Sequence, residues 1–271
     1  MSNETDRRRL IVGAATGYRP DQVRMFVESL RATGYSGDVM MLVGYFQWRL
    51  KAYLRRHGVH TVSSWSTRKL HGPIHAYRFE KFAEIVHANA ERYDQVMVSD
   101  VRDVVFQKHP FDGVTSPACH FYLEGNKTIG NEPTNARWAK LFLSPGDAAK
   151  IGVCLVSCCG VVLGGIGPMN EYLARLAGYL HALPMKIRRK GGADTVFHNK
   201  MAHLTHEVSA VIVENNVHVA SMGLEPPSAY IVDERGQIRT VDGHLPAILH
   251  QYDRIPHVRD AVEARFRLPR N

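Results

Sequence analysis

The sequence predicts an α/β domain built on a mainly parallel β-sheet. Short apolar runs typical of strands buried on both faces alternate with amphipathic helical segments through residues 10–106. Polar side chains often follow these runs directly, where parallel strands would end. This alternation is typical of a layer of strands covered by helices. The 271 residues can bury a substantial core and contain no repeat or linker, so we expect a single domain.

The N-terminal part has the clearest periodicity. Pro20 lies in the first turn of a predicted helix, which places Val23, Phe26, Val27 and Leu30 on one face. The expected elements are a strand at residues 10–15, a helix at 20–30, a strand at 38–43, a helix at 47–57, a strand at 59–62, a helix beginning near residue 76 and a strand beginning at Val96.

After Pro110 the pattern weakens, and fewer elements can be predicted. They are a loop at residues 125–133, a strand at 151–163, a helix at 169–183, a basic mobile loop at 186–192, a helix opening at Asp194, a strand at 208–219 and a strand ending at His250.

Composition restricts the class of protein. Hydrophobic residues make up 45% and charged residues 22%, which is ordinary for a soluble globular protein. The net charge of +8 favours anionic partners such as nucleotides, phosphates, nucleic acid or acidic membranes. The four cysteines form no C-x-x-C pair, which argues against a disulfide framework or a cysteine zinc site. We expect buried free thiols.

No apolar run is long enough for a signal peptide or a membrane-spanning helix, so we expect a cytoplasmic protein. Peripheral membrane contact could still occur through Arg259, Arg265, Arg267 and Arg270 near the C-terminus.

The most informative residues are Asp100 and Asp103, which interrupt an apolar stretch at the end of a predicted strand. Carboxylates in such a place are costly unless a cation uses their charge. Ligands of open α/β sheets bind at this end of the strands, and Mg²⁺ or Mn²⁺ is commonly held by one or two carboxylates with substrate phosphates. A solvated turn in which Arg102 pairs with an aspartate is the alternative.

Other candidates are weaker alone. His250 follows an apolar strand and carries an imidazole suited to Mn²⁺. Glycines at Gly13 and Gly160 could allow close backbone approach to a ligand, or could only serve strand packing. Asp194 follows two glycines and is either a helix cap or a carboxylate aimed at a sugar.

Together these segments resemble the nucleotide-sugar-dependent glycosyltransferases of the A-type fold, especially the glycogenin and galactosyltransferase-like group. The matching segments run in the family's order across nearly the whole chain. They are Tyr77-Arg78-Phe79, the aspartate motif at residues 99–111, the small-residue strand at 158–164, Gly192-Ala-Asp194-Thr, and residues 248–254 around His250.

The resemblance implies a Rossmann-like α/β/α sandwich, with a nucleotide-binding half at about residues 1–112 and a sugar- and acceptor-facing half at about 113–271. It implies transfer of a sugar, with retention, from a nucleoside diphosphate, expected to be UDP, to an acceptor hydroxyl. Asp103 and His250 would hold Mn²⁺ or Mg²⁺, with Asp100 as a further ligand or a ribose contact. Asp194 would be the catalytic residue. The implied donor-binding residues are Gly13, Ala14, Thr16, Tyr18, Arg78, Ser99, Asp100, Arg102, Cys159 and Gly160.

The resemblance leaves the acceptor open among a glycan, a lipid-linked molecule and a protein. Residues 125–137 and 185–192 are the predicted acceptor loops, and the basic segment 186–190 would add positive charge near the diphosphate. The chain departs from the family in its Asp-x-x-Asp spacing, which makes Asp103 the better candidate for the direct ligand. Cys158 and Thr195 also replace usual polar residues.

Three rival functions use the same observations. A metal-dependent phosphohydrolase or nucleotidyltransferase would need the same carboxylates. Cys158 and Thr195 would also suit a degenerate protein that binds a nucleotide sugar without turnover. A nucleic-acid-binding protein is disfavoured, because the basic residues are dispersed and no recognition motif is present.

Overall fold

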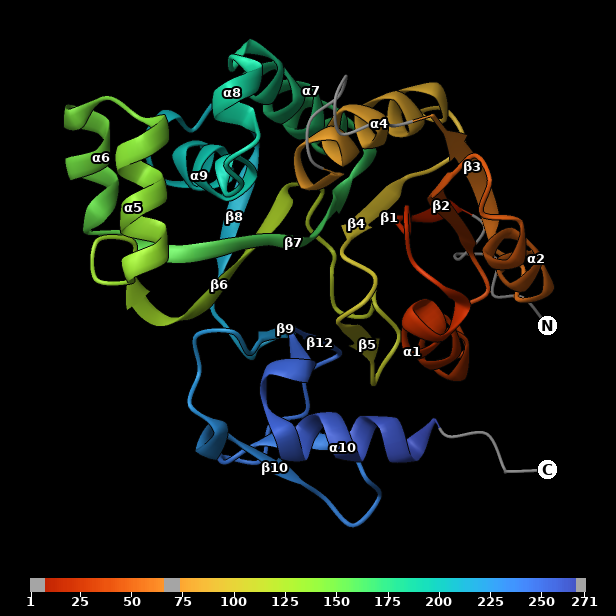
Figure 1. Cartoon of the computed structure of the whole chain (residues 1–271). Helices are drawn as coiled ribbons and strands as arrows, with labels where there is room; N and C mark the ends of the chain where they lie inside the picture. The colour runs from red at the N-terminus through yellow and green to blue at the C-terminus, as the bar shows by residue number, and fades with distance from the viewer. Residues whose placement is uncertain (1–7, 66–73, 267–271) are drawn as a thin grey trace.

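A seven-stranded sheet organises the computed structural model, which describes residues 8–65 and 74–266 (Figure 1). Its strand order is β3 (His60–Ser64), β2 (Asp38–Gly44), β1 (Arg9–Ala14), β4 (Gln95–Ser99), β7 (Leu155–Gly165), β6 (Cys119–Thr128) and β8 (Ala210–Val213). The first four strands are parallel, β7 is antiparallel to both its neighbours, and β8 is parallel to β6. The predicted mixed α/β architecture with a mostly parallel sheet is therefore confirmed.

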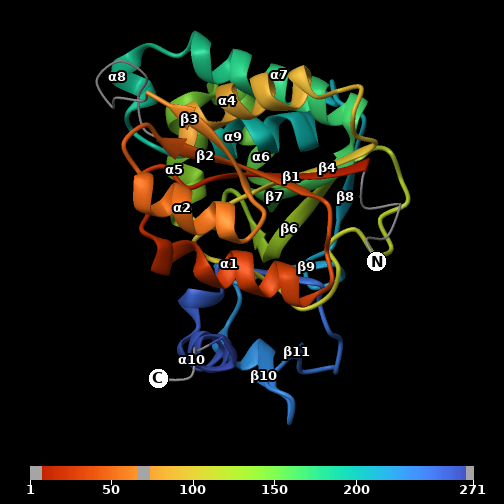
Figure 2. The same cartoon turned by 90° about the vertical axis from the view of Figure 1, so that its right-hand side faces the viewer.

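Helices cover both faces of this sheet, and Figure 2 shows α4 and α7 above it and α1 below it. On one face, α1 (Pro20–Ala32) and α2 (Trp48–Arg56) pack on alternate residues of the strands, such as Ile11 and Met97. On the other face, Leu10 and Val96 pack with α4 (Ile74–Ala88), α7 (Ile166–Ala182) and α9 (Ala193–Lys200). The central strands β1 and β4 are mostly apolar because both of their faces are buried, whereas the edge strand β3 is polar and partly exposed.

The remaining helices flank the second half of the sheet. They are α5 (Pro133–Phe142), α6 (Pro145–Gly152), the short α8 (Met185–Arg188) and the π-helical turn η2 (Met201–Thr205), which extends α9.

A second, three-stranded sheet lies beyond the carboxyl end of β4. It has the order β5 (Val104–Phe106), β12 (Ile248–His250) and β9 (Val219–Ser221), with β12 antiparallel to β5 and parallel to β9. The hairpin β10 (Tyr230–Val232) and β11 (Ile238–Thr240), the turns η3 (Pro227–Ala229) and η4 (Tyr252–Arg254), and α10 (Pro256–Arg265) complete this part. Phe26 of α1 packs edge-on against Phe106 at 4.9 Å between ring centroids, which fastens the second sheet to the first layer.

Several predicted boundaries were wrong in the second half. The predicted loop at residues 125–133 begins as strand, because β6 continues through polar residues to Thr128, past Gly125 at φ +71° and irregular pairing with β7, and only residues 129–132 form the turn. The predicted strand at 208–219 is two strands, since the chain leaves β8 in the large sheet and enters β9 in the small one. Neither β6 nor the pair α5 and α6 was predicted.

The predicted strand at 151–163 and helix at 169–183 were each misplaced at one end. Residues 151–152 close α6, and α7 already begins at Ile166. The predicted mobile loop at 186–192 begins as α8, because the buried Arg188 donates to Glu80 at 3.3 Å and to the His181 carbonyl at 2.6 Å. Polar anchors of this kind, made by residues far apart in sequence, leave no periodic signal.

All four cysteines are free, and Cys119, Cys158 and Cys159 are buried. Within residues 8–65 and 74–266, no helix has both the length and the hydropathy needed to cross a membrane.

His198 is a fully buried histidine that holds α9 to the sheet and to α7. Its ring nitrogens lie 2.9 Å from the Ser157 hydroxyl and 2.9 Å from the Tyr172 hydroxyl. Burial lowers the pKa of His198 to about 3. The imidazole is therefore neutral in the fold and has a structural role.

This burial predicts acid-sensitive stability. An unfolded histidine titrates near pH 6.5, so between about pH 6.5 and 3 the unfolded chain binds a proton that folded His198 does not bind. The contribution of neutral His198 to the free energy of unfolding is complete above pH 6.5 and is lost as the pH falls below this value. We expect about 2 kcal/mol less stability at pH 5 than at pH 7.5 from this group.

Urea unfolding of the native protein and of His198→Gln at several pH values would measure this contribution. The variant should show a shallower pH dependence, because glutamine can hydrogen-bond to both hydroxyls but does not titrate. Equal pH slopes in the two proteins would contradict the assignment.

Candidate metal centre

The two sheets bring Asp100, Asp103 and His250 together. Asp100 follows β4, a turn leads to Asp103 just before β5, and His250 ends β12. Because β12 pairs with β5 in the register His250 to Val104, the histidine lies beside Asp103, and the Gln251 amide donates to the Asp103 carbonyl at 2.8 Å. One ligand atom from each side chain lies within 4.8 Å of the others. A single cation could contact all three.

Gly160 provides the space for this cluster. The Asp100 amide donates to its carbonyl at 2.6 Å, so β7 runs directly beside the carboxylate. A Cβ at position 160 would lie 2.2 Å from Cε1 and 2.6 Å from Nε2 of His250, and 3.0 Å from an Asp100 oxygen. Any side chain here would displace the imidazole.

The chemistry of this donor set fits Mn²⁺ or Mg²⁺. The buried His250 Nε2 lies 3.5 Å from an Asp100 oxygen, at the limit of a hydrogen bond, and has no hydrogen-bond partner in the described part of the chain. Its other nitrogen, Nδ1, lies 3.7 Å from the Cys158 sulfur. An imidazole held at one nitrogen, with the other directed at two carboxylates, is a usual arrangement for a metal ligand.

The charges of the cluster are strongly coupled. Burial opposes ionisation of Asp100, but Arg78 and His250 outweigh it, and the pKa falls to about 2. Burial raises the pKa of Asp103, with the Asp100 charge adding to this effect and His250 opposing it. Burial lowers the pKa of His250, but the two carboxylates reverse this, and its pKa is raised. Asp100 is thus a fixed anion, and a second positive charge would stabilise Asp103.

Arg78 connects the cluster to Asp194. It extends from α4, pairs with an Asp100 oxygen through Nη1, and lies 3.6 Å from an Asp194 oxygen through Nη2. Burial works against the charge of Arg78, but these two carboxylates raise its pKa. The predicted metal ligand and the predicted catalytic aspartate therefore share one guanidinium.

Asp194 lies in the first turn of α9, with only 6% of its surface exposed. The helix begins after Gly192, whose φ of +82° favours glycine. A Cβ at Gly192 would lie 2.2 Å from the ring of Trp138, so that α5 packs directly on the backbone that precedes Asp194.

The predicted nucleotide-binding residues 13–18 have separate roles. A Cβ at Gly13 would lie 2.5 Å from the side chain of Val101. The absence of a side chain at Gly13 therefore serves packing. Ala14 ends β1 next to it. Thr16 and Tyr18 each line a surface pocket, of about 390 and 600 Å³. Burial raises the pKa of Tyr18, and the charges of Asp100 and Asp103 add to this effect.

Three other residues that were predicted to contact the donor already interact with protein groups in the fold. The Ser99 hydroxyl donates to the Asp100 carbonyl at 2.6 Å. Arg102 pairs with Asp253 at 2.9 Å and lies 3.6 Å from Asp103. Cys159 is buried, with its sulfur 3.8 Å from the Thr195 hydroxyl. The Arg102 pairing agrees with the alternative of a turn in which an arginine pairs with an aspartate, and the three candidate metal ligands lie beside this turn.

Sequence reasoning missed residues that shape the site. The Gln47 amide accepts from Gly17 and Gly44 and donates to the Tyr18 carbonyl at 2.7 Å, tying the loops after β1 and β2 together. Glu124 is buried, and burial raises its pKa, with His250 opposing this effect. Neither residue stands next to a recognisable motif. A third supporting residue, Gln251, directly follows the predicted ligand His250 in the sequence. Its backbone has a φ of +58°.

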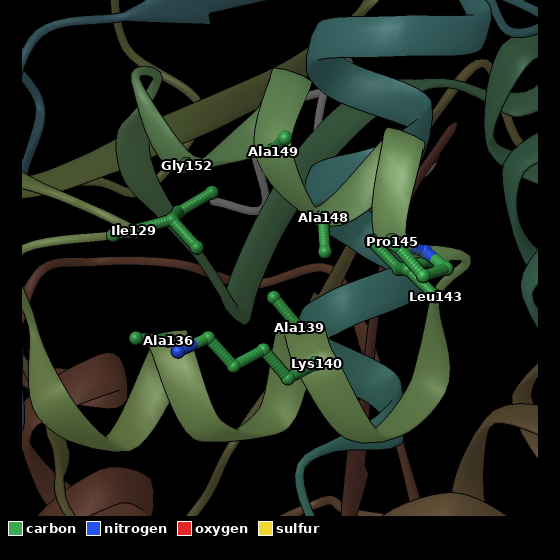
Figure 3. Close-up of a pocket in the computed structure, with 10 residues that line it drawn as sticks. Ile129, Ala136, Ala139, Lys140, Leu143, Pro145, Ala148, Ala149 and Gly152 are labelled. Carbon is green, nitrogen blue, oxygen red and sulfur yellow. The ribbon is translucent and has the colours of Figure 1, made fainter.

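The apolar pocket shown in Figure 3 lies away from these residues. It has a volume of about 400 Å³ between α5 and α6, and its lining includes Ile129, Gly130 and Ala136 of the predicted acceptor loop but none of the predicted metal-binding, donor-binding or catalytic residues. The candidate site therefore depends on convergent polar groups and not on this hollow.

No protein-family model matches the chain, and no curated protein matches it.

The space at Gly160 yields a direct prediction. Gly160→Ala should lower the affinity for Mn²⁺ at least tenfold, because the new methyl group would push His250 away from the carboxylates. Calorimetric titration with Mn²⁺ would measure the change, with circular dichroism to verify folding.

Gly178→Ala is the matched control, since a Cβ at this helical glycine of α7 meets nothing within 4 Å. It should keep the affinity for Mn²⁺ and raise stability by up to about 1 kcal/mol. Unchanged Mn²⁺ binding in a folded Gly160→Ala protein would count against this metal centre.

Proposed function

We propose that this chain is a metal-dependent glycosyltransferase that moves a sugar from a nucleoside diphosphate, most simply UDP, to an acceptor hydroxyl. The observation that carries the proposal is the link from Asp100 through Arg78 to Asp194. This link joins a cluster of possible metal ligands to a buried carboxylate near the carboxyl end of β4, which supports a single site there. The mostly parallel sheet agrees with the Rossmann-like A-type sandwich that the sequence resemblance implies.

The leaving group would be a diphosphate, whose departure requires neutralisation of its charge. Asp103, His250 and Asp100 would hold Mn²⁺ or Mg²⁺, which as a Lewis acid supplies this positive charge when bound. Arg78 holds Asp100 ionised and in place. The nucleotide would lie along the loop after β1, where Thr16 and Tyr18 line adjoining pockets and Gln47 fixes the backbone.

Asp194 would face the anomeric carbon of the donor sugar. Its burial at the start of α9 and its distance of 3.6 Å from Arg78 hold the carboxylate in one position. A fixed negative charge there would orient the sugar hydroxyls or stabilise an oxocarbenium-like centre. Retention of configuration follows from the resemblance.

The division of the chain supports the same proposal. Residues of the first half supply the loop after β1 and both aspartates, whereas Gly160, Asp194 and His250 come from the second half. We propose that one domain, with about residues 1–112 for the nucleotide and 113–271 for the sugar and acceptor, forms the site at this junction.

A panel of nucleotide sugars would test the proposed activity. With Mn²⁺, at least one UDP sugar should raise the melting temperature and be slowly hydrolysed, and a chelator should abolish both effects. If nucleoside triphosphates instead raise the melting temperature and a phosphate ester is cleaved, the protein is a phosphohydrolase or nucleotidyltransferase. If a nucleotide sugar raises the melting temperature but is not turned over, the protein is a degenerate one that only binds it.

Asp103→Asn should weaken Mn²⁺-dependent UDP binding at least tenfold, because a carboxylate ligand is lost. Asp112→Asn is the control, since Asp112 is a largely exposed aspartate of the same segment. Equal UDP affinities of the two variants in Mn²⁺ would remove Asp103 from the metal centre.

Asp194→Asn should separate binding from chemistry. The amide keeps the shape of the side chain but loses its charge, so turnover should fall at least a hundredfold while UDP affinity in Mn²⁺ changes less than threefold. Turnover and affinity that fall together would assign Asp194 to donor binding and not to the reaction.

A further inference from the structure

Four large aromatic side chains are exposed together on the surface. Tyr45, Phe46, Trp48 and Trp65 are 57%, 74%, 68% and 60% exposed. Tyr45, Phe46 and Trp65 contact one another, with ring centroids 5.3 to 5.4 Å apart. We call these four residues the aromatic surface. Exposed apolar side chains that gather in this way usually mark a binding surface.

The aromatic surface lies at the outer edge of the large sheet. Tyr45 and Phe46 form the turn after β2, Trp48 begins α2, and Trp65 follows β3. Figure 1 shows α2 and β3 together at this edge. Phe46 lines both adjoining pockets, so the four side chains form one continuous surface.

The helix α2, which begins at Trp48 of the aromatic surface, is basic. The helix carries Arg49, Lys51, Arg55 and Arg56 and no acidic residue. The Arg49 guanidinium lies 4.9 Å from the Trp48 ring centroid, and the Lys51 ammonium lies 5.3 Å from that of Tyr45. In residues 8–65 and 74–266, none of these four cations forms a salt bridge with a carboxylate. Their charge remains available to an anionic partner.

We propose that the aromatic surface and the basic residues of α2 dock the protein on an anionic lipid bilayer. Tyrosine and tryptophan side chains prefer the boundary between lipid headgroups and acyl chains. Clustered cations are attracted to the negative surface of the membrane. A protein partner would favour an interface core depleted of charge, whereas here cations lie directly over two of the aromatic rings.

Docking in this orientation would place the candidate site beside the membrane. Thr16 and Tyr18 line the same two pockets as the aromatic surface. Membrane binding itself requires no catalysis, so its test is independent of the proposed transferase activity.

Vesicle binding with tryptophan fluorescence would test the proposal. Two of the three tryptophans belong to the aromatic surface, so insertion should shift the emission to shorter wavelength. We expect co-sedimentation and the shift with vesicles of phosphatidylcholine and phosphatidylglycerol in equal parts. Neither effect should occur with phosphatidylcholine alone, and high salt should weaken both.

Two pairs of variants separate the aromatic from the electrostatic contribution. Phe46→Ser with Trp48→Ser should reduce vesicle affinity at least tenfold, whereas Val153→Ser with Val241→Ser, at valines 78% and 64% exposed elsewhere, should not. Arg55→Gln with Arg56→Gln should lower affinity by about fivefold per charge removed. Lys150→Gln with Arg235→Gln is the control for loss of charge at exposed positions.

All these residues are exposed, so circular dichroism should show every variant folded. Absence of binding to anionic vesicles would overturn the proposal, as would equal losses in the variants and their controls. If Phe46→Ser with Trp48→Ser instead lowers UDP affinity while no vesicle binding occurs, the aromatic surface belongs to the nucleotide site.

Discussion

The close approach of Asp100 and His250 over Gly160 is the constraint on which the site depends. These residues come from three strands or strand ends, and their backbones are joined by sheet hydrogen bonds on both sides of the cluster. The large sheet supplies Asp100 and Gly160, and the small sheet supplies His250. Displacement of the small sheet would therefore separate the three candidate ligands, and it would also disturb the core under α1, where Phe26 packs on Phe106.

Electrostatics makes this arrangement costly in the absence of a ligand. Asp100, Asp103 and Asp194 are removed from water to different extents, and Arg78 contacts two of them. Buried ion pairs seldom repay the loss of hydration, so the cluster is not explained by stability. Asp103, whose pKa is raised by burial and by its neighbour Asp100, is the carboxylate that most needs a further cation.

Sequence reasoning predicted the N-terminal sheet and the members of the cluster, because strand runs and the polar residues after them are local signals. Every predicted strand and helix up to β4 is present, within one or two residues. It missed β6, α5 and α6, where Gly125 and polar residues break the periodicity. The supporting residues Gln47, Glu124 and Trp138 were also missed, because their roles arise only when distant segments meet.

The most direct test of the central claim is anomalous diffraction at the manganese edge from crystals grown with Mn²⁺ and UDP. The account predicts one strong peak between the Asp103 carboxylate and Nε2 of His250, within reach of Asp100, with the UDP diphosphate on its open side. A metal bound elsewhere, or UDP bound with no anomalous peak at these three residues, would contradict it.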